Sequence, residues 1–330
     1  MTAALRPMNL GEILDRTFEI YRKRFLLFVG IAALPALIGL GLQLADLDWL
    51  HVRSLAQPVG RLNIFVWGFV VELGFLQVYA LATIPVVPSF FHSASKGYFG
   101  ESDSVLRSLH VAVARWRVYL WTGILKWIAE YFFPEVAAVA LMIGVGVAGD
   151  ALGAFEGRYM VPVIFVFILP IAVFCVLLLW MGACFSLAYP IAVLEQGSGW
   201  KSMRRSWKLS KGSRLRIAST WLAIAVVSWL LILGVQSVFR WLFILLYRGL
   251  HLGVFWVKFY LPLTHALSAA VCAFILPIYP IAITLIYYDQ RIRQEGFDIV
   301  RMMEAAGMSA SVELPVDAVS VAVDAREAQA

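Results

Sequence analysis

Charged residues are scarce in this chain, and cysteine is scarcer still. Only 15% of its 330 residues are charged and 62% are hydrophobic, whereas about 25% of residues are charged in ordinary soluble domains. A soluble core of this size could not hide so much apolar surface, which excludes an ordinary water-soluble protein. The three cysteines, Cys175, Cys184 and Cys272, lie within apolar runs. They therefore indicate small buried side chains rather than a disulfide framework or a metal site.

Catalytic motifs are missing as well. The sequence contains neither a Gly-rich phosphate loop ending in Gly-Lys-Ser/Thr nor a His-Glu-x-x-His metal helix. Phe155 stands where a nucleophile elbow between Gly153 and Gly157 would need a serine. We therefore expect a protein that is not an enzyme and has no cofactor or metal. The net charge of +6 suits an anionic membrane surface, and we do not expect a nucleic-acid partner.

Long hydrophobic runs are what the chain has in abundance. A helix needs about 20 apolar residues to cross the hydrocarbon core of a bilayer. Six runs are long enough, at residues 25–45, 64–88, 117–147, 161–190, 217–246 and 261–287. A helix satisfies its own backbone hydrogen bonds in lipid, and the alternating pattern of a membrane barrel is missing. The sequence therefore predicts an all-α integral membrane protein with six transmembrane helices.

The basic residues fall on alternate sides of these runs. Of the 27 lysines and arginines, 20 lie in the segments 1–24, 89–117, 195–216 and 288–330. Loops rich in lysine and arginine face the cytoplasm, so both termini are predicted to be cytoplasmic. We divide the chain into a membrane domain over residues 1–300 and a mostly disordered cytoplasmic tail over residues 301–330, which has no aromatic residue and no sustained apolar stripe.

Three of the basic segments share a five-residue pattern. It begins at Arg16, Arg107 and Arg205, and each arginine is followed by a small hydroxyl residue, a large apolar residue, any residue and an aliphatic one. The ends of the even-numbered runs also resemble one another, with Tyr189-Pro190-Ile191-Ala192-Val193, Tyr279-Pro280-Ile281-Ala282-Ile283 and a fainter Ile84-Pro85-Val86-Val87.

These matches predict three repeated units, at residues 8–88, 99–194 and 199–290. Each would be a basic amphipathic cytoplasmic helix followed by a membrane hairpin, repeated around an axis along the membrane normal. The alternative is that any short basic helix before a membrane span looks like this.

Apolar stripes at helical spacing mark the amphipathic segments. The stripe in the first comprises Leu10, Ile13, Leu14, Thr17, Phe18, Tyr21 and Phe25, and that in the third comprises Trp200, Met203 and Trp207. Such helices can lie in the headgroup layer, where basic residues attract anionic lipid. The candidate residues for binding lipid or a partner are Arg16, Arg107, Arg204, Arg205 and Lys208. We expect membrane lipids, anionic ones above all, as partners, or a protein partner or second copy of the chain. Alternatively, these charges only set the topology.

The ionisable residues inside the predicted spans include Glu72, Lys126 and Glu130, which we take as a candidate polar cluster. Keeping a charge at that depth is costly, so each is a functional candidate by default. Lys126 and Glu130 are four positions apart and can pair on one helix face. The alternative is a structural cluster in which Glu72 bonds to Lys126. As a second hypothesis for function, the three residues would serve a small transporter or channel with pseudo-threefold repeats.

Three stretches of the sequence resemble a known family. They are residues 7–14, the run Arg205-Ser206-Trp207-Lys208-Leu209, and the closing Glu295-Gly296-Phe297-Asp298. Over about residues 7–300 the chain resembles the membrane domain of bacterial glycerophosphoryl diester phosphodiesterases and, more distantly, a group of bacterial inner-membrane proteins. The resemblance implies a multi-pass protein of the bacterial cytoplasmic membrane. The phosphodiesterase barrel that follows this domain in some members has no counterpart in residues 301–330, so it does not imply phosphodiesterase activity.

Overall fold

The computed structural model describes residues 7–54, 74–75, 77–151, 160–249, 257–299 and 303. Within these ranges every regular element is a helix, and none is a strand. Five helical stretches are long and apolar enough to cross a membrane: Phe25–Ala45, Trp116–Ala148, Ile168–Leu194, Arg214–Gly249 and Pro262–Glu295. They match five of the six predicted runs. Residues 64–73 and 76 of the predicted second span (64–88), with Glu72 among them, and the predicted tail except residue 303 lie outside the described residues.

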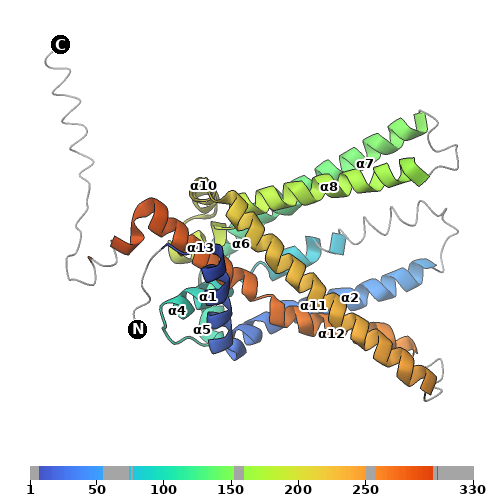
Figure 1. The fold of residues 1–330 in the computed structure, drawn as a ribbon, viewed down its shortest axis with the longest axis horizontal. Helices are drawn as coiled ribbons and strands as arrows, with labels where there is room; N and C mark the ends of the chain where they lie inside the picture. The colour runs from blue at the N-terminus through green and yellow to red at the C-terminus, as the bar shows by residue number, and fades with distance from the viewer. Residues whose placement is uncertain are drawn as a thin grey trace, which may run out of the picture.

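The long helices extend from one end of the molecule, where most of the short helices gather (Figure 1). In chain order the elements are α1 (Leu10–Lys23), α2 (Phe25–Ser54), α4 (Val87–Tyr98), α5 (Val105–Ala114), α6 (Trp116–Trp127), the π-helix η1 (Ile128–Phe132), α7 (Phe133–Ala151), α8 (Met160–Phe185), α9 (Ala188–Leu194), α10 (Gly199–Leu209), α11 (Arg214–Gly249), α12 (Val257–Ile275) and α13 (Ile278–Glu295). We call the end formed by α1, α4, α5, α9, α10 and α13 the basic end. From it, α7 and α8 run outward side by side, and α2 packs along α12.

The first helix shows how local sequence sets an element. Asn9 caps α1 by accepting a hydrogen bond from the Glu12 N–H, and the Glu12 carboxylate accepts one from the Asn9 N–H. This reciprocal capping box satisfies two backbone donors that a helix start leaves without partners. The predicted stripe is only partly buried: Ile13 and Thr17 are inside, whereas Phe18 is 51% exposed. The helix ends at Lys23 rather than continuing to Phe25.

On α10 the residues of the predicted apolar stripe are divided between the outside and the inside of the protein. Trp200 and Trp207 are 61% and 41% exposed, and the buried face includes Met203 together with Ser202 and Ser206. The reason is close packing, because the Ser206 hydroxyl donates to the Cys184 carbonyl at the end of α8, at 2.8 Å. Small hydroxyl residues allow such an approach, and the large indoles are left outside.

Each of three apolar segments is interrupted by a short turn and resumes as a new helix. The turns lie at residues 84–86, 186–187 and 276–277, just before α4, α9 and α13. Pro88, Pro190 and Pro280 stand in the first turns of these helices, where the missing N–H of proline costs nothing. The counterpart of the later prolines in the first segment is therefore Pro88, which lies inside α4, and not the predicted Pro85, which lies in the turn before it.

At the basic end the helices pack in a closed cycle. Helix α4 packs on α5, α9 on α10, and α13 on α1. Each pairing therefore joins a helix at the end of one predicted unit, or for α4 just beyond that end, to the first helix of the next unit. Helix α4 also contacts both α9 and α13. The two chain regions farthest apart in sequence, α1 and α13, are thereby held together.

Three arginine–carbonyl hydrogen bonds follow the same cycle. Arg24 donates to the Glu101 carbonyl, before α5. Arg115 donates to the Gln196 carbonyl, before α10, at 3.0 Å. Arg216 donates to the Met8 carbonyl, before α1, at 2.5 Å. Each of these arginines stands at or near the start of a helix that leads away from the basic end (α2, α6 or α11). Each accepting carbonyl belongs to the loop that leads into the next basic-end helix.

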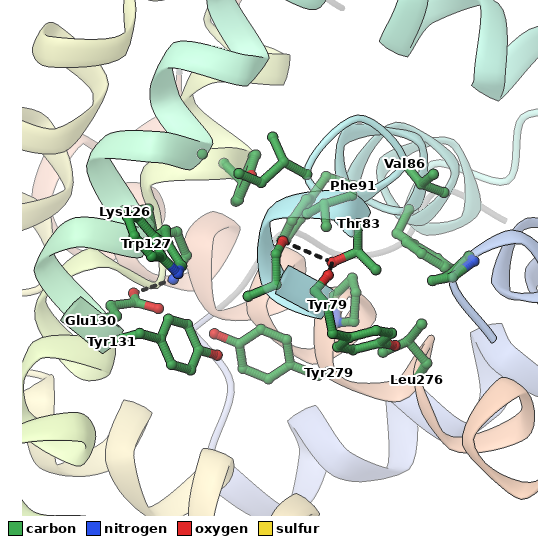
Figure 2. Close-up of a pocket in the computed structure, with 18 of the residues that line it drawn as sticks. Tyr79, Thr83, Val86, Phe91, Lys126, Trp127, Glu130, Tyr131, Leu276 and Tyr279 are labelled. Carbon is green, nitrogen blue, oxygen red and sulfur yellow. Dashed lines mark hydrogen bonds and ion pairs between the residues drawn. The ribbon is translucent and has the colours of Figure 1, made fainter. Parts of the chain in front are cut away.

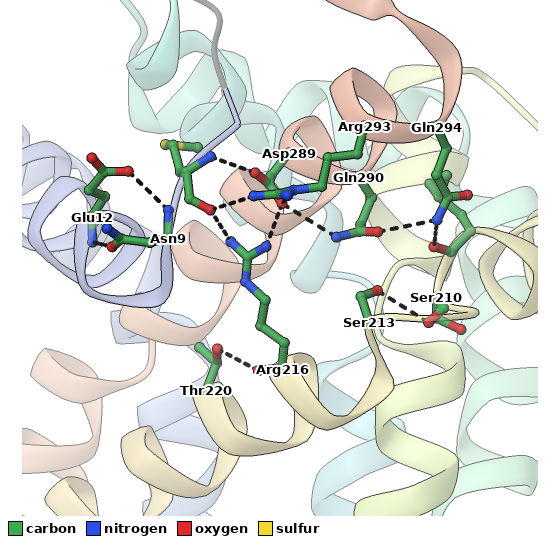
Figure 3. A network of polar contacts seen from close by, with 12 residues as sticks. Asn9, Glu12, Ser210, Ser213, Arg216, Thr220, Asp289, Gln290, Arg293 and Gln294 are labelled. Atoms are coloured by element: carbon green, nitrogen blue, oxygen red, sulfur yellow. Dashed lines mark hydrogen bonds and ion pairs between the residues drawn. The ribbon is translucent and has the colours of Figure 1, made fainter.

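A buried carboxylate joins three of these segments (Figure 3). The side chain of Asp289, on α13, is fully buried. It accepts hydrogen bonds from the Met8 N–H at 2.7 Å, from Arg216 at 2.8 Å and from Arg293 at 2.9 Å. Arg293 also donates to the Met8 carbonyl, at 3.0 Å. The charge of Asp289 is thus compensated on several sides, as a buried carboxylate requires.

Candidate intramembrane binding cavity

A cavity of about 370 Å³ lies among the long helices, next to the three turns that interrupt them. Its wall combines residues of α2, α4, α6, η1, α9, α11, α12 and α13 with the segment 79–86. Small-molecule sites in proteins have volumes of about 300–1,000 Å³ and mostly apolar walls with a few polar groups. This cavity fits that description in both size and lining.

The charged part of the wall is an ion pair between Lys126 of α6 and Glu130 of η1 (Figure 2). Their side chains are only 12% and 7% exposed. Glu130 and its neighbour Tyr131 belong to a single π-helical turn, which directly precedes Pro134 near the start of α7. Such turns are rare and are found at functional sites. The sequence predicted that these two residues could pair, and the structure contains the pair.

Aromatic side chains provide most of the remaining polar groups. Tyr79, Tyr131, Tyr189 and Tyr279 line the cavity. In Figure 2 the hydroxyls of Tyr131 and Tyr279 point toward one another. The Thr83 hydroxyl donates to the backbone carbonyls of Tyr79 and Ala80, in its own helical turn, at 3.0 Å. Within the described ranges, by contrast, no residue is hydrogen-bonded to any of the four tyrosine hydroxyls, so all four can serve a ligand.

Residues at equivalent places in the three predicted units meet at this cavity. Pro35, Lys126 and Ile224 each follow the first arginine of their pattern by 19 positions (35 − 16, 126 − 107, 224 − 205), and all three line the wall. Val87, Tyr189 and Tyr279, which directly precede Pro88, Pro190 and Pro280, line it too.

The candidate lipid-binding residues lie elsewhere, at the basic end. Arg107, Arg204 and Lys208 are exposed, and Arg16 is half-buried with its guanidinium 3.7 Å from the Glu19 carboxylate. Arg205 is occupied within the protein, because it forms ion pairs with Glu195 and, at 2.8 Å, with Glu295. Burial by itself would lower the pKa of Arg205, but these carboxylates outweigh it and raise the pKa.

Sequence reasoning found the ion pair but missed the tyrosines. Tyr189 and Tyr279 belong to the repeated Tyr-Pro pairs, which served in the sequence analysis only as evidence for repeated units. The repetition of a tyrosine beside a helix-breaking proline, inside apolar runs, was the signal that could have placed both hydroxyls at one site. For Tyr79 and Tyr131 the sequence offers no comparable signal.

Comparison with known proteins identifies no relative, since no family model, no curated protein and no solved structure matches the chain. The resemblance to the phosphodiesterase membrane domain therefore stays a prediction. Within the described ranges, no cluster of three or more histidine, cysteine, aspartate or glutamate side chains is arranged to hold a metal ion.

Proposed function

We propose that the protein is a non-enzymatic, multi-pass protein of the bacterial cytoplasmic membrane that binds a small amphipathic molecule in the intramembrane cavity and transports it. One observation carries this proposal: the buried Lys126–Glu130 pair faces a cavity of about 370 Å³. Ionisable side chains are costly inside a bilayer and typically serve a ligand or ion path. Interrupted helices around a central site are a recurrent construction in transporters.

The architecture that goes with this proposal has six spans in three units around an axis along the membrane normal. Support comes from the cyclic packing of α4 on α5, α9 on α10 and α13 on α1, and from the equivalent positions of Pro35, Lys126 and Ile224 at the cavity. The basic end would face the cytoplasm with both termini, as the distribution of lysine and arginine predicts. The resemblance to the phosphodiesterase membrane domain likewise implies a multi-pass protein of the bacterial cytoplasmic membrane.

The test is to block the cavity from one helix. Ser228 of α11 lines the cavity, and its neighbour Val227 is 50% exposed on the outside of the same helix. After gentle extraction, native mass spectrometry should detect a small molecule retained by the wild type and by the Val227→Trp variant, and lost from Ser228→Trp. The identified molecule is then used for flux measurements in proteoliposomes. Equal retention by the two variants, or an empty wild-type protein, would contradict the proposal.

A second candidate function is binding of anionic lipid, or of a protein partner, through the basic end. The exposed side of α10 favours it, because Lys201, Arg204 and Lys208 lie there together with the exposed Trp200 and Trp207. Indole rings prefer the headgroup region, and each basic residue near an anionic leaflet contributes about 1 kcal/mol of attraction. Arg205 takes no part in this surface, since its partners are Glu195 and Glu295.

Charge reversal separates this candidate from the first. The double variant Arg204→Glu/Lys208→Glu should retain less phosphatidylglycerol in native mass spectra, while the molecule held in the cavity stays bound. Arg240→Glu/Arg248→Glu is the control, because those two arginines are also exposed and lie on α11, which runs away from the basic end. Unchanged lipid retention in the α10 variant, or an equal loss in the control, would remove the support for lipid binding at this surface.

A further inference from the structure

The cavity has a polar side and an apolar side. Lys126, Trp127, Glu130 and Tyr131 come from consecutive turns of α6 and η1 and lie together in Figure 2, whereas Val86 and Leu276 lie on the far side, with Tyr279 between the two groups. At the positions equivalent to Lys126, the other two predicted units place Pro35 and Ile224. A ligand that fills the cavity must therefore present a polar group at one end and an apolar body at the other.

Among the described residues that line the cavity, the only side chains charged near neutral pH are the two members of one ion pair, so together they add no net charge to the polar side. A singly charged ligand would attract one member and repel the other at close range. Both members are nearly excluded from solvent, so water could not screen the repulsion. A ligand without net charge, by contrast, can exchange hydrogen bonds with the pair while the balance of charge is kept.

We infer that the cavity selects amphiphiles of zero net charge, either neutral or zwitterionic, whose polar group contacts Lys126, Glu130 and the hydroxyls of Tyr131 and Tyr279. This inference rests on the proposed function, since it names the class of molecule that the same cavity takes. The ion pair acts as the selectivity element: it offers a cation to the acceptors of the ligand and a carboxylate to its donors. Pro35, Ile224 and Leu276 contact the apolar body.

The experiment compares four six-carbon probes that differ only in their polar end: hexanamide (neutral), norleucine (zwitterionic), hexanoate (anionic) and hexylammonium (cationic). The full-length protein is placed in nanodiscs of zwitterionic lipid at pH 7, and binding is measured by saturation-transfer NMR with empty nanodiscs subtracted. We expect the wild type to bind hexanamide or norleucine at least about tenfold more tightly than either ion.

Single substitutions in the ion pair should then reverse the selectivity. Glu130→Gln leaves the Lys126 ammonium unpaired and should favour hexanoate, and Lys126→Gln leaves the Glu130 carboxylate unpaired and should favour hexylammonium. The double variant is neutral again and should prefer hexanamide over both ions. Thermal unfolding of each variant shows whether it is folded. If a single variant fails to fold, the wild type and the double variant still decide the question.

The outcomes separate this inference from the proposed function. If the probes bind and the Ser228→Trp substitution displaces them, but a charged probe is preferred by the wild type, the inference is overturned and the cavity remains a binding site. If no probe binds while native mass spectrometry still detects a retained molecule, the inference is overturned for this class of ligand. If nothing binds and nothing is retained, both are wrong.

Discussion

Two stretches that are long and apolar enough to cross a membrane have the same mean hydropathy but different surroundings in this protein. In the most apolar stretch of α11 no residue is buried, whereas half of the residues are buried in the corresponding stretch of α12 and α13. Helix α11 exposes Trp229, Leu230 and Trp241, and α13 hides Ile281, Leu285 and Tyr287 completely or nearly so. Hydropathy therefore identifies a span but does not say whether lipid or protein surrounds it.

Polar contacts explain why α13 is buried and α11 is exposed. Helix α13 carries Asp289, which binds the Met8 N–H, Arg216 and Arg293. These contacts must be made inside the protein, because lipid offers no partner for them. The second half of α13 is thus held at the centre of the basic end, and the apolar residues before it are covered by α4 and α11. Helix α11 meets this network only in its first turns, through Arg216, and then leaves the basic end. Farther along the helix, Gln236 donates a hydrogen bond to the Ser268 hydroxyl of α12 at 2.7 Å.

Among the substitutions considered, removal of the Asp289 charge at the centre of the basic end should lower the stability of the fold most. Asp289→Asn leaves Arg216 and Arg293 without their carboxylate, and breaking a buried ion pair from one side costs about 3–5 kcal/mol. We expect a loss of that size in thermal unfolding followed by circular dichroism in mild detergent. Asp15→Asn is the control, since Asp15 is exposed on α1. Equal stability of the two variants would show that the network does not hold α13.

A smaller effect should separate the two helices directly. Ile281→Ala, on α13, removes apolar atoms from a fully buried site and should cost about 2–4 kcal/mol. Leu230→Ala, on α11, changes a side chain that is 64% exposed and should cost less than about 1 kcal/mol, because no cavity forms where lipid can fill the space. The same unfolding measurement in nanodiscs compares them. A cost for Leu230→Ala as large as that for Ile281→Ala would mean that α11 is covered by protein, for instance by a second copy of the chain.

Glycines allow the same comparison at a finer scale. A Cβ at Gly123 of α6 would lie 2.5 Å from both the Ile84 Cγ2 and the Tyr189 hydroxyl, whereas a Cβ at Gly144 of α7 would meet nothing within 4 Å. Gly123→Ala should cost about 1–3 kcal/mol through overpacking, and Gly144→Ala should stabilise its helix slightly. Thermal unfolding checks the signs. A destabilised Gly144→Ala variant would place a further element against α7.

The smallest effect concerns pH at the edge of the basic end. Burial would raise the pKa of Asp103, but hydrogen bonds from Ser108, the Ser104 N–H and Ser93 outweigh it and hold the pKa below its ordinary value of 3.8. The carboxylate therefore stabilises the fold above the ordinary value, and this contribution is lost as the pH falls through the lowered pKa. Between pH 6 and pH 3, in roughly the range where carboxylates protonate, the unfolding temperature of the wild type should fall slightly more than that of Asp103→Asn. Parallel curves would contradict this role.

Local patterns could be predicted from the sequence, and long-range pairings could not. The Lys126–Glu130 pair follows from a spacing of four residues, and five of the predicted spans follow from continuous apolar runs. The partners of Arg205 and Asp289 did not follow: Glu295 is 90 positions from Arg205, and Met8 is 281 positions from Asp289. Periodicity carries no information about such pairs, so the ion pairs of Arg205 with Glu195 and Glu295 could not be predicted.

The sequence by itself determined that this chain is helical and apolar enough to span a membrane, and it located the charges that such a chain cannot leave unpaired. Only the tertiary structure decided which face of each helix meets protein, that Tyr189 and Tyr279 line one cavity, and that the Lys126–Glu130 pair faces the same cavity. The physical reason is that an apolar residue is equally satisfied by lipid and by protein. In a membrane protein, polar contacts and close packing that lipid cannot supply therefore determine which helix faces are buried. These contacts are made between residues far apart in the chain.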